Sequence, residues 1–187
     1  MKMMKKILPV LLIGFACAFP LSAQEEDAAD DVFAPVPRQF RALALGMPLQ
    51  ELTAALTADA LFTFRGERDV SFVPVRQETL VETGGNLFIR HAHFQLVDGE
   101  VFIMSFTMDT QLIDHYSLFT TFVNRFGQPL ILNPAEAVWE DDYTRVSIER
   151  PLTVKYIDRA VFDRLLEESE TLQAWETLLR EQFLGEF

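Results

Sequence analysis

The dipeptide Asp98-Gly99 restricts the fold more than any other feature, because it separates two apolar runs in the manner of a β-hairpin. Both residues of such a turn adopt positive φ, which Asp and Gly tolerate better than other residues do. The pattern predicts one strand over residues 87–97 and a second over residues 100–108. The second run is apolar on both of its faces, as is typical of a central strand that is covered on both sides.

Amphipathic helices accompany the predicted strands, because apolar residues recur at spacings of three and four. The helices are expected over residues 48–59, 112–126 and 158–184. Further strands are expected over residues 137–148, as a hairpin, and 152–156. A helix thus precedes antiparallel strands twice, which indicates a duplicated unit. The prediction is a single α+β domain over residues 39–187, with helices packed on one face of an antiparallel sheet and a long C-terminal helix.

The first 23 residues have the plan of a secretory signal peptide. Three lysines precede an apolar run from Ile7 to Phe19, and the expected cleavage site follows Ala23. The run is shorter than the ~20 residues that a membrane span requires. Cys17, the only cysteine, follows a poor lipobox, so we expect it to be an apolar residue of the signal peptide, and lipid attachment at Cys17 is the alternative. The mature chain is therefore expected to be exported, with the periplasm as its compartment.

The mature chain is expected to be strongly acidic. The whole sequence has a net charge of −12, and removal of three lysines with the signal peptide brings the charge to −15. Such a charge argues against nucleic acid or an anionic membrane surface as a partner, and it is compatible with a basic protein. Residues 24–38 combine five acids with Pro35 and Pro37, which predicts an acidic, disordered linker ahead of the domain.

The three histidines are candidates for a metal site. His91 and His93 are two residues apart on a predicted strand, so both point to the same face. Met104 and Met108 on the next strand would add soft ligands if they lay near that face, and His115 is the remaining histidine. A metal site needs three or four convergent ligands. The favoured interpretation is a half-exposed strand face without a metal.

Sequence motifs of catalysis do not occur in this chain. It has neither the glycine fingerprints of nucleotide sites nor the nucleophile elbow of serine hydrolases. The carboxylates at residues 140–142 are expected to face solvent at a hairpin tip. The aromatic stripe of the helix at residues 112–126 is expected to be core, and a pocket beneath it for an apolar ligand is the alternative. We therefore expect a protein that is not an enzyme and holds no cofactor.

The far half of the last helix is the best candidate for contact with a partner. A helix that overhangs a domain of this size would present an apolar face with a tryptophan. The candidate residues are Leu172, Trp175, Leu179 and Phe183. The partner would be another envelope protein or a second copy of the chain. The competing interpretation is that this face folds back onto its own sheet, as most amphipathic helices do.

Two short passages resemble small envelope lipoproteins of the SmpA/OmlA type. The sequence LGMPLQEL at residues 45–52 is similar to the start of a helix in that group. The sequence FGQP at residues 126–129, followed by a strand with Trp139, is similar to a passage shared by that group and the β-lactamase-inhibitor-protein-like fold. The resemblance implies helices on one face of an antiparallel sheet and a role in binding proteins. The expected function is an envelope interaction or assembly module, and a binding domain for an apolar ligand or a metal ion is the alternative.

Overall fold

The computed structural model describes residues 33–73 and 78–184. The predicted signal peptide and residues 24–32 of the predicted linker lie outside the described residues. Residues 33–38, the remainder of that linker, contact the folded domain. The backbone N–H of Ala34 donates to the carbonyl of Arg125, and the side chain of Arg38 donates to Asp158 and Thr144. The part of the chain that packs on the domain therefore includes residues ahead of the predicted boundary at residue 39.

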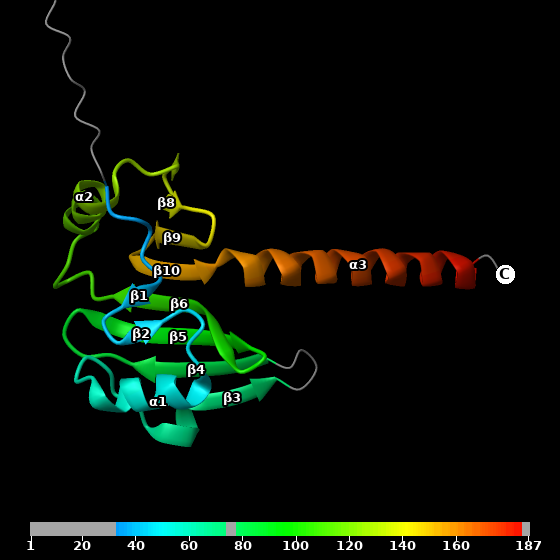
Figure 1. Ribbon diagram of the computed structural model, residues 1–187, viewed down its shortest axis with the longest axis horizontal. Helices are drawn as coiled ribbons and strands as arrows, with labels where there is room; N and C mark the ends of the chain where they lie inside the picture. The colour runs from blue at the N-terminus through cyan, green and yellow to red at the C-terminus, as the bar shows by residue number, and fades with distance from the viewer. Residues whose placement is uncertain (1–32, 74–77, 185–187) are drawn as a thin grey trace, which may run out of the picture. The chain divides into compact units, whose positions relative to one another are not determined.

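An eight-stranded antiparallel sheet forms the body of the described chain, in the order β3-β4-β5-β6-β10-β9-β8-β7 (Figure 1). The strands are β1 (Gln39–Phe40), β2 (Leu43–Ala44), β3 (Val70–Val73), β4 (Glu78–Gly84), β5 (Ile89–Val97), β6 (Glu100–Met108), β7 (Ile131–Leu132), β8 (Glu136–Glu140), β9 (Thr144–Glu149) and β10 (Thr153–Asp158). The helices are α1 (Leu49–Ala58), the 3-10 helix η1 (Gly66–Asp69), α2 (His115–Phe126) and α3 (Arg159–Leu184). This architecture confirms the predicted α+β fold with a long C-terminal helix.

The strand order repeats one unit twice. Helix α1 precedes the four strands β3–β6, and helix α2 precedes the four strands β7–β10. The last strands of the two units, β6 and β10, pair with each other at the centre of the sheet. The sheet thus consists of two antiparallel meanders that meet along their last strands. This arrangement agrees with the duplicated unit that the sequence predicts.

The central hairpin forms where the sequence predicts it. Asp98 and Gly99 adopt φ values of 54° and 83°, the positive values that a tight two-residue turn between right-twisted strands requires. Strand β6 pairs with β5 on one side and with β10 on the other, so the prediction of a central strand is confirmed. Helix α2 begins at His115, three residues later than predicted, because the Asp114 carboxylate accepts the N–H of Ser117 and caps the helix there.

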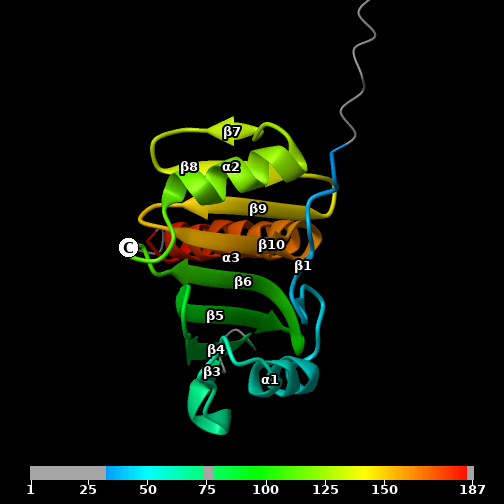
Figure 2. The ribbon, with the colours of Figure 1, turned by 90° about the vertical axis from the view of Figure 1, so that its left-hand side faces the viewer.

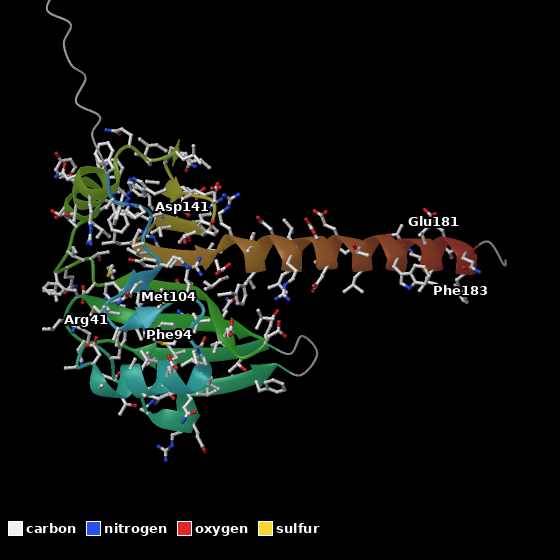
Figure 3. All side chains as sticks on the ribbon, in the orientation of Figure 1. Arg41, Phe94, Met104, Asp141, Glu181 and Phe183 are labelled. Atoms are coloured by element: carbon white, nitrogen blue, oxygen red, sulfur yellow. The ribbon has the colours of Figure 1, made fainter. Side chains whose placement is uncertain are left out.

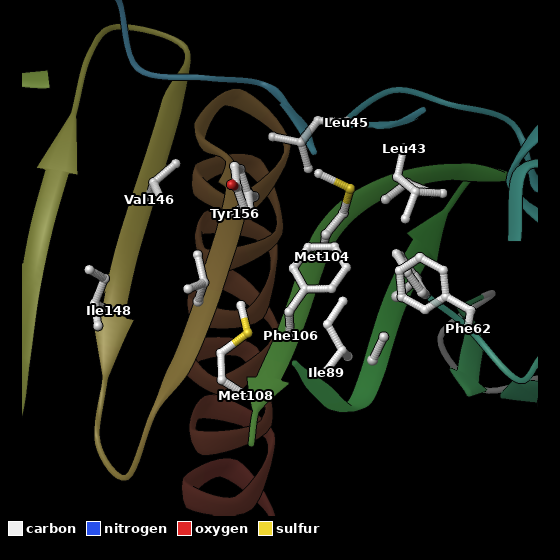
Figure 4. Packing of buried hydrophobic residues seen from close by; sticks show 14 of the residues in the cluster. Leu43, Leu45, Phe62, Ile89, Met104, Phe106, Met108, Val146, Ile148 and Tyr156 are labelled. Carbon is white, nitrogen blue, oxygen red and sulfur yellow. The ribbon is translucent and has the colours of Figure 1, made fainter. Parts of the chain in front are cut away.

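Helices α1 and α2 lie on one face of the sheet, which we call the helix face, and α3 leaves from the opposite side (Figure 2). Cross-strand pairing aligns buried side chains along the helix face. One such row consists of Val81, Phe94, Met104, Tyr156, Val146 and Trp139. Leu52 and Leu56 of α1 cover one end of the core and Phe122 of α2 covers the other. Figure 4 shows the labelled core side chains on this side of the strands, with α3 behind them.

Candidate functional site

The face opposite α1 and α2, which we call the open face, carries a mixture of polar, charged and apolar side chains. Strand register defines its rows, since directly paired residues share a face. One row consists of Leu80, Gln95, Ile103, Ile157, Arg145 and Glu140. The next consists of Glu82, His93, Ser105, Lys155, Ser147 and Val138. The helix face therefore holds the core, whereas the open face is mixed and includes the buried residues Val138 and Ser147.

A groove of about 520 Å³ lies on the open face where α3 leaves the sheet. Its apolar part is formed by Ile103, Ile157 and Phe162, the last of which is in the first turn of α3. Its polar part is formed by His93, Gln95, Ser105, Arg145, Glu149 and Lys155. The groove therefore combines residues of β5, β6, β9, β10 and α3. A concave surface with an apolar floor and polar walls is the usual form of a binding site.

The cations in this groove already have acidic partners. Lys155 donates to both carboxylate oxygens of Glu149, at 2.8 Å each, and Ser147 donates to the same carboxylate at 2.9 Å. Burial opposes the ionisation of Glu149, but these hydrogen bonds outweigh it, and the pKa of Glu149 is lowered. Arg145 lies 3.6 Å from Glu136 and 3.7 Å from Glu140. The groove therefore offers no unpaired cation to an anionic ligand among its described residues.

The base of α3 is fixed to the sheet by Asp158, the last residue of β10. One oxygen of its carboxylate accepts the N–H of Val161, which caps the helix, and the other accepts Arg38 at 2.5 Å. The next residue, Arg159, donates to the carbonyl of Asp141 at 2.6 Å. Strand β10 thus continues into α3 without a loop between them. These contacts hold the first turn of the helix against the domain.

Beyond this base, α3 is exposed along its length (Figure 3). The exposed fraction is 64% for Leu172 and 59% for Trp175, whereas it is 2% for Trp139, the other tryptophan of the chain. The four predicted partner-binding residues are all exposed: Leu172, Trp175, Leu179 and Phe183. Leu178 is exposed to the same degree as Trp175. In this structure the apolar face of α3 does not fold back onto the sheet of its own chain.

His91 and His93 lie on the same face of β5, as predicted, but His115 does not join them. His93 lies on the open face and is 3.6 Å from Glu82. His115 lies in α2, on the helix face, where its ring stacks on Phe119. Met104 and Met108 are buried in the core of the helix face, so they do not lie on the face of His93 as a copper site would need. No group of three or more histidine, cysteine, aspartate or glutamate residues that could hold a metal is present in residues 33–73 and 78–184.

The acidic hairpin tip and the aromatic stripe have structural roles. Asp141 accepts the backbone N–H groups of Tyr143 and Thr144 and so closes the turn between β8 and β9. Phe119 and Phe122 lie with their ring centres 6.0 Å and 5.2 Å from that of Trp139, within the core. Phe119 and Phe122 therefore pack on the sheet, as the core interpretation requires. Tyr116, near the start of the helix, is exposed and lines a groove of about 420 Å³ together with His115 and Phe119.

Sequence reasoning missed an apolar groove of about 970 Å³ between α1 and residues 64–70. Leu49, Phe64 and Val70 are its larger apolar residues, and small residues of α1 form one wall. A run of Ala and Thr at helical spacing in residues 53–58 is the only signal that could have indicated it. Its two sides come from α1 and from residues 64–70, which only the tertiary packing brings together.

No helix within the described part of the chain is long and apolar enough to cross a membrane. The interruption of α3 by charged residues explains this, since six acids and three arginines are distributed along it.

These features define the class of protein: a two-unit α+β domain whose sheet is covered on one face and bears a projecting helix on the other. Residues 38–168 match the TP0088 domain family, and the chain belongs to this family. The match includes the sheet, α1, α2 and the first turns of α3, and it ends before the far half of α3. Searches of the curated proteins and of the solved structures gave no match. The resemblance to SmpA/OmlA proteins stays a prediction.

Proposed function

We propose that this chain is an exported, non-enzymatic interaction module of the cell envelope, and that the far half of α3 binds a partner protein. The observation that carries the proposal is the exposed apolar strip formed by Leu172, Trp175, Leu178 and Leu179. A continuous apolar patch of this kind on a folded domain usually marks an interface. A projecting helix also gains stability from a partner, because isolated helices are marginal in water.

Charge favours a basic partner over a second copy of the chain. The whole sequence carries −12, and α3 has six acids against three arginines. Two copies would therefore repel each other as they approached, whereas a basic surface would be attracted. The expected partner is a protein with an apolar groove whose rim carries lysine or arginine residues. Recognition of an amphipathic helix in an apolar groove is a common mode of protein binding.

Site-specific photo-crosslinking in cells of the native host tests this proposal. A photoreactive residue at position 173, beside the apolar strip, is compared with one at position 124 on α2, where Asn124 is exposed. We expect an adduct with one basic protein from position 173 only, and loss of that adduct in the Leu172→Glu variant. An adduct that persists in this variant would contradict the role of α3. An adduct with twice the mass of the mature chain would show that the partner of α3 is a second copy rather than a basic protein.

Export is tested separately by the mass of the protein purified from its own host. We expect a chain that begins at Gln24 and is recovered in the envelope or periplasmic fraction. Recovery of the complete 187-residue chain from the cytoplasm would contradict this part of the proposal. An increase in mass from a lipid on Cys17 would show that the exported protein is anchored to a membrane rather than released.

The groove on α1 favours a second candidate function, the binding of an apolar ligand. Its volume of about 970 Å³ lies at the upper end of the range for small-molecule sites. Native mass spectrometry of protein from its own host tests this alternative, because a bound ligand would add a defined mass. We expect this mass to be lost in a Thr53→Trp variant, whose side chain would fill the groove. A clean mass for the wild-type chain would exclude the candidate.

A further inference from the structure

The apolar face of α3 continues into the groove on the open face. Phe162, Leu165, Leu172 and Leu179 are separated by three, seven and seven residues, so they lie along one side of the helix. Phe162 also lines the groove together with Ile103 and Ile157. Apolar residues on this side of the helix therefore extend from the groove to the far end of α3, with Glu168 and Ser169 between Leu165 and Leu172. One occupant can contact both parts.

The charges around this surface are predominantly acidic. The strands of the open face carry six carboxylates against two cations: Glu78, Glu82, Glu100, Glu136, Glu140 and Glu149 against Arg145 and Lys155. The two cations are held by carboxylates of the same face. Helix α3 adds an excess of three acids. A basic occupant is therefore favoured at both ends of the surface, and an acidic occupant is repelled.

The main chain of the open face excludes an occupant that binds as an added strand. Strands β5, β6, β10 and β9 around the groove are each paired on both sides, so their backbone groups are already hydrogen-bonded. Strand addition requires a free sheet edge. The long part of the surface is instead the side of a helix, whose ridges and grooves suit another helix. From Phe162 to Leu179 the surface is ~26 Å long at a rise of 1.5 Å per residue.

We propose that an amphipathic basic helix of the partner lies along α3 and ends in the groove on the open face, against Ile103, Ile157 and Phe162. This inference rests on the proposed function, since it assigns the occupant of the same helix, and it adds the sheet to the interface. The groove thus anchors the end of the partner helix, while the apolar strip of α3 holds its length.

A synthetic peptide serves as the probe. It has about 18 residues, with leucine along one face and lysine on the other, because that length matches the surface. Two control peptides are used. One has glutamate in place of lysine, and the other has the composition of the lysine peptide in scrambled order. Binding of labelled peptide to the full mature chain is measured by fluorescence anisotropy. The wild type is compared with Ser105→Arg and Phe162→Ser in the groove, Leu172→Glu on α3, and Asn124→Arg on α2.

Ser105→Arg and Asn124→Arg form a matched pair, because both add one positive charge and only the first adds it to the groove. We expect Ser105→Arg, Phe162→Ser and Leu172→Glu each to weaken binding at least about fivefold, and Asn124→Arg to change it less than about twofold. Thermal unfolding of each variant establishes that it is folded. Phe162→Ser keeps the test decisive if Ser105→Arg is unfolded, because Phe162 lies outside the sheet.

The outcomes separate this inference from the proposed function. Loss of binding in Leu172→Glu alone would remove the groove from the interface and leave the role of α3 intact. Loss of binding in the groove variants alone would exclude α3 from the interface and would contradict the proposed function. Equal binding of the lysine and glutamate peptides, or of the scrambled peptide, would overturn the basic amphipathic helix as occupant. Failure of the wild type to bind the lysine peptide would overturn it as well.

Discussion

The two faces of the sheet differ although they are built from the same strands. Phe106 of β6 is fully buried on the helix face, in contact with the rings of Phe94 and Tyr156. Its neighbour Ser105 points to the open face and lines the groove. Alternation along a strand makes such adjacent residues belong to separate environments. The core cluster is therefore on the helix face, and the groove of the open face and the exposed part of α3 are available for recognition.

The largest expected effect is on the helix face. Phe106→Ala should lower the free energy of unfolding by about 3–5 kcal/mol, because it leaves a cavity at the centre of the core. Ser105→Ala, one residue earlier, should change it by less than about 0.5 kcal/mol. Urea unfolding followed by circular dichroism measures both. Similar losses in the two variants would mean that the faces do not differ in their contribution to stability.

A smaller effect is expected at the start of α2, which covers the helix face. Asp114 accepts hydrogen bonds from the N–H and the hydroxyl of Ser117, and these bonds lower its pKa. Asp114→Ala should reduce the free energy of unfolding, as loss of a helix N-cap usually does. Asp114→Asn, which keeps a capping oxygen, should recover most of the loss. Equal losses in the two variants would contradict a capping role.

The charged open face should respond to pH. The pKa of Glu149 is lowered in the folded chain from its usual 4.5, so its contribution is complete above pH 4.5 and is lost as the pH falls through the folded value. Glu149→Gln should reduce stability by less than about 1 kcal/mol at pH 7, and this difference should be smaller at a pH below 4.5. Unfolding at the two pH values measures it. A difference that does not change with pH would exclude the ionised carboxylate as its cause.

The smallest effect on stability is expected at the apolar strip of α3. Leu172→Ser should change the free energy of unfolding of the domain by less than about 0.5 kcal/mol, because Leu172 is exposed. Acrylamide quenching should also distinguish the two tryptophans, with Trp175 accessible and Trp139 protected. The Trp175→Phe variant isolates the signal of Trp139. Strong protection of Trp175 in the free chain would show that α3 is covered, contrary to the structure.

The elements with local signals were predictable from the sequence. Asp98-Gly99 requires positive φ at both residues, and this requirement determines the turn of the central hairpin. The helices follow from apolar residues at spacings of three and four. The prediction of the start of α2 was less accurate. The apolar pattern extends back to Leu112, whereas the hydrogen bond from the N–H of Ser117 to Asp114 decides where the helix begins.

The candidate site was predicted in part. The sequence indicated Leu172, Trp175, Leu179 and Phe183 as surface residues of the last helix, because a helix of this length exceeds what the domain can cover. The groove at its base was not predicted. Ile103 and Ile157 are separated by more than fifty residues and meet only because β6 pairs with β10. Strand β6 is apolar on both faces, so alternation alone could not show which face α1 and α2 cover.

The sequence by itself determined the class of elements, the central hairpin, the acidic charge and the apolar face of the last helix, because each depends on residues that are close in the chain. The tertiary structure decided which face of the sheet is buried and that α3 leaves from the other. It also placed His115 on the opposite side of the sheet from His91 and His93. These outcomes depend on which strands pair and where the helices pack, and such long-range contacts are decided by the packing of the whole core.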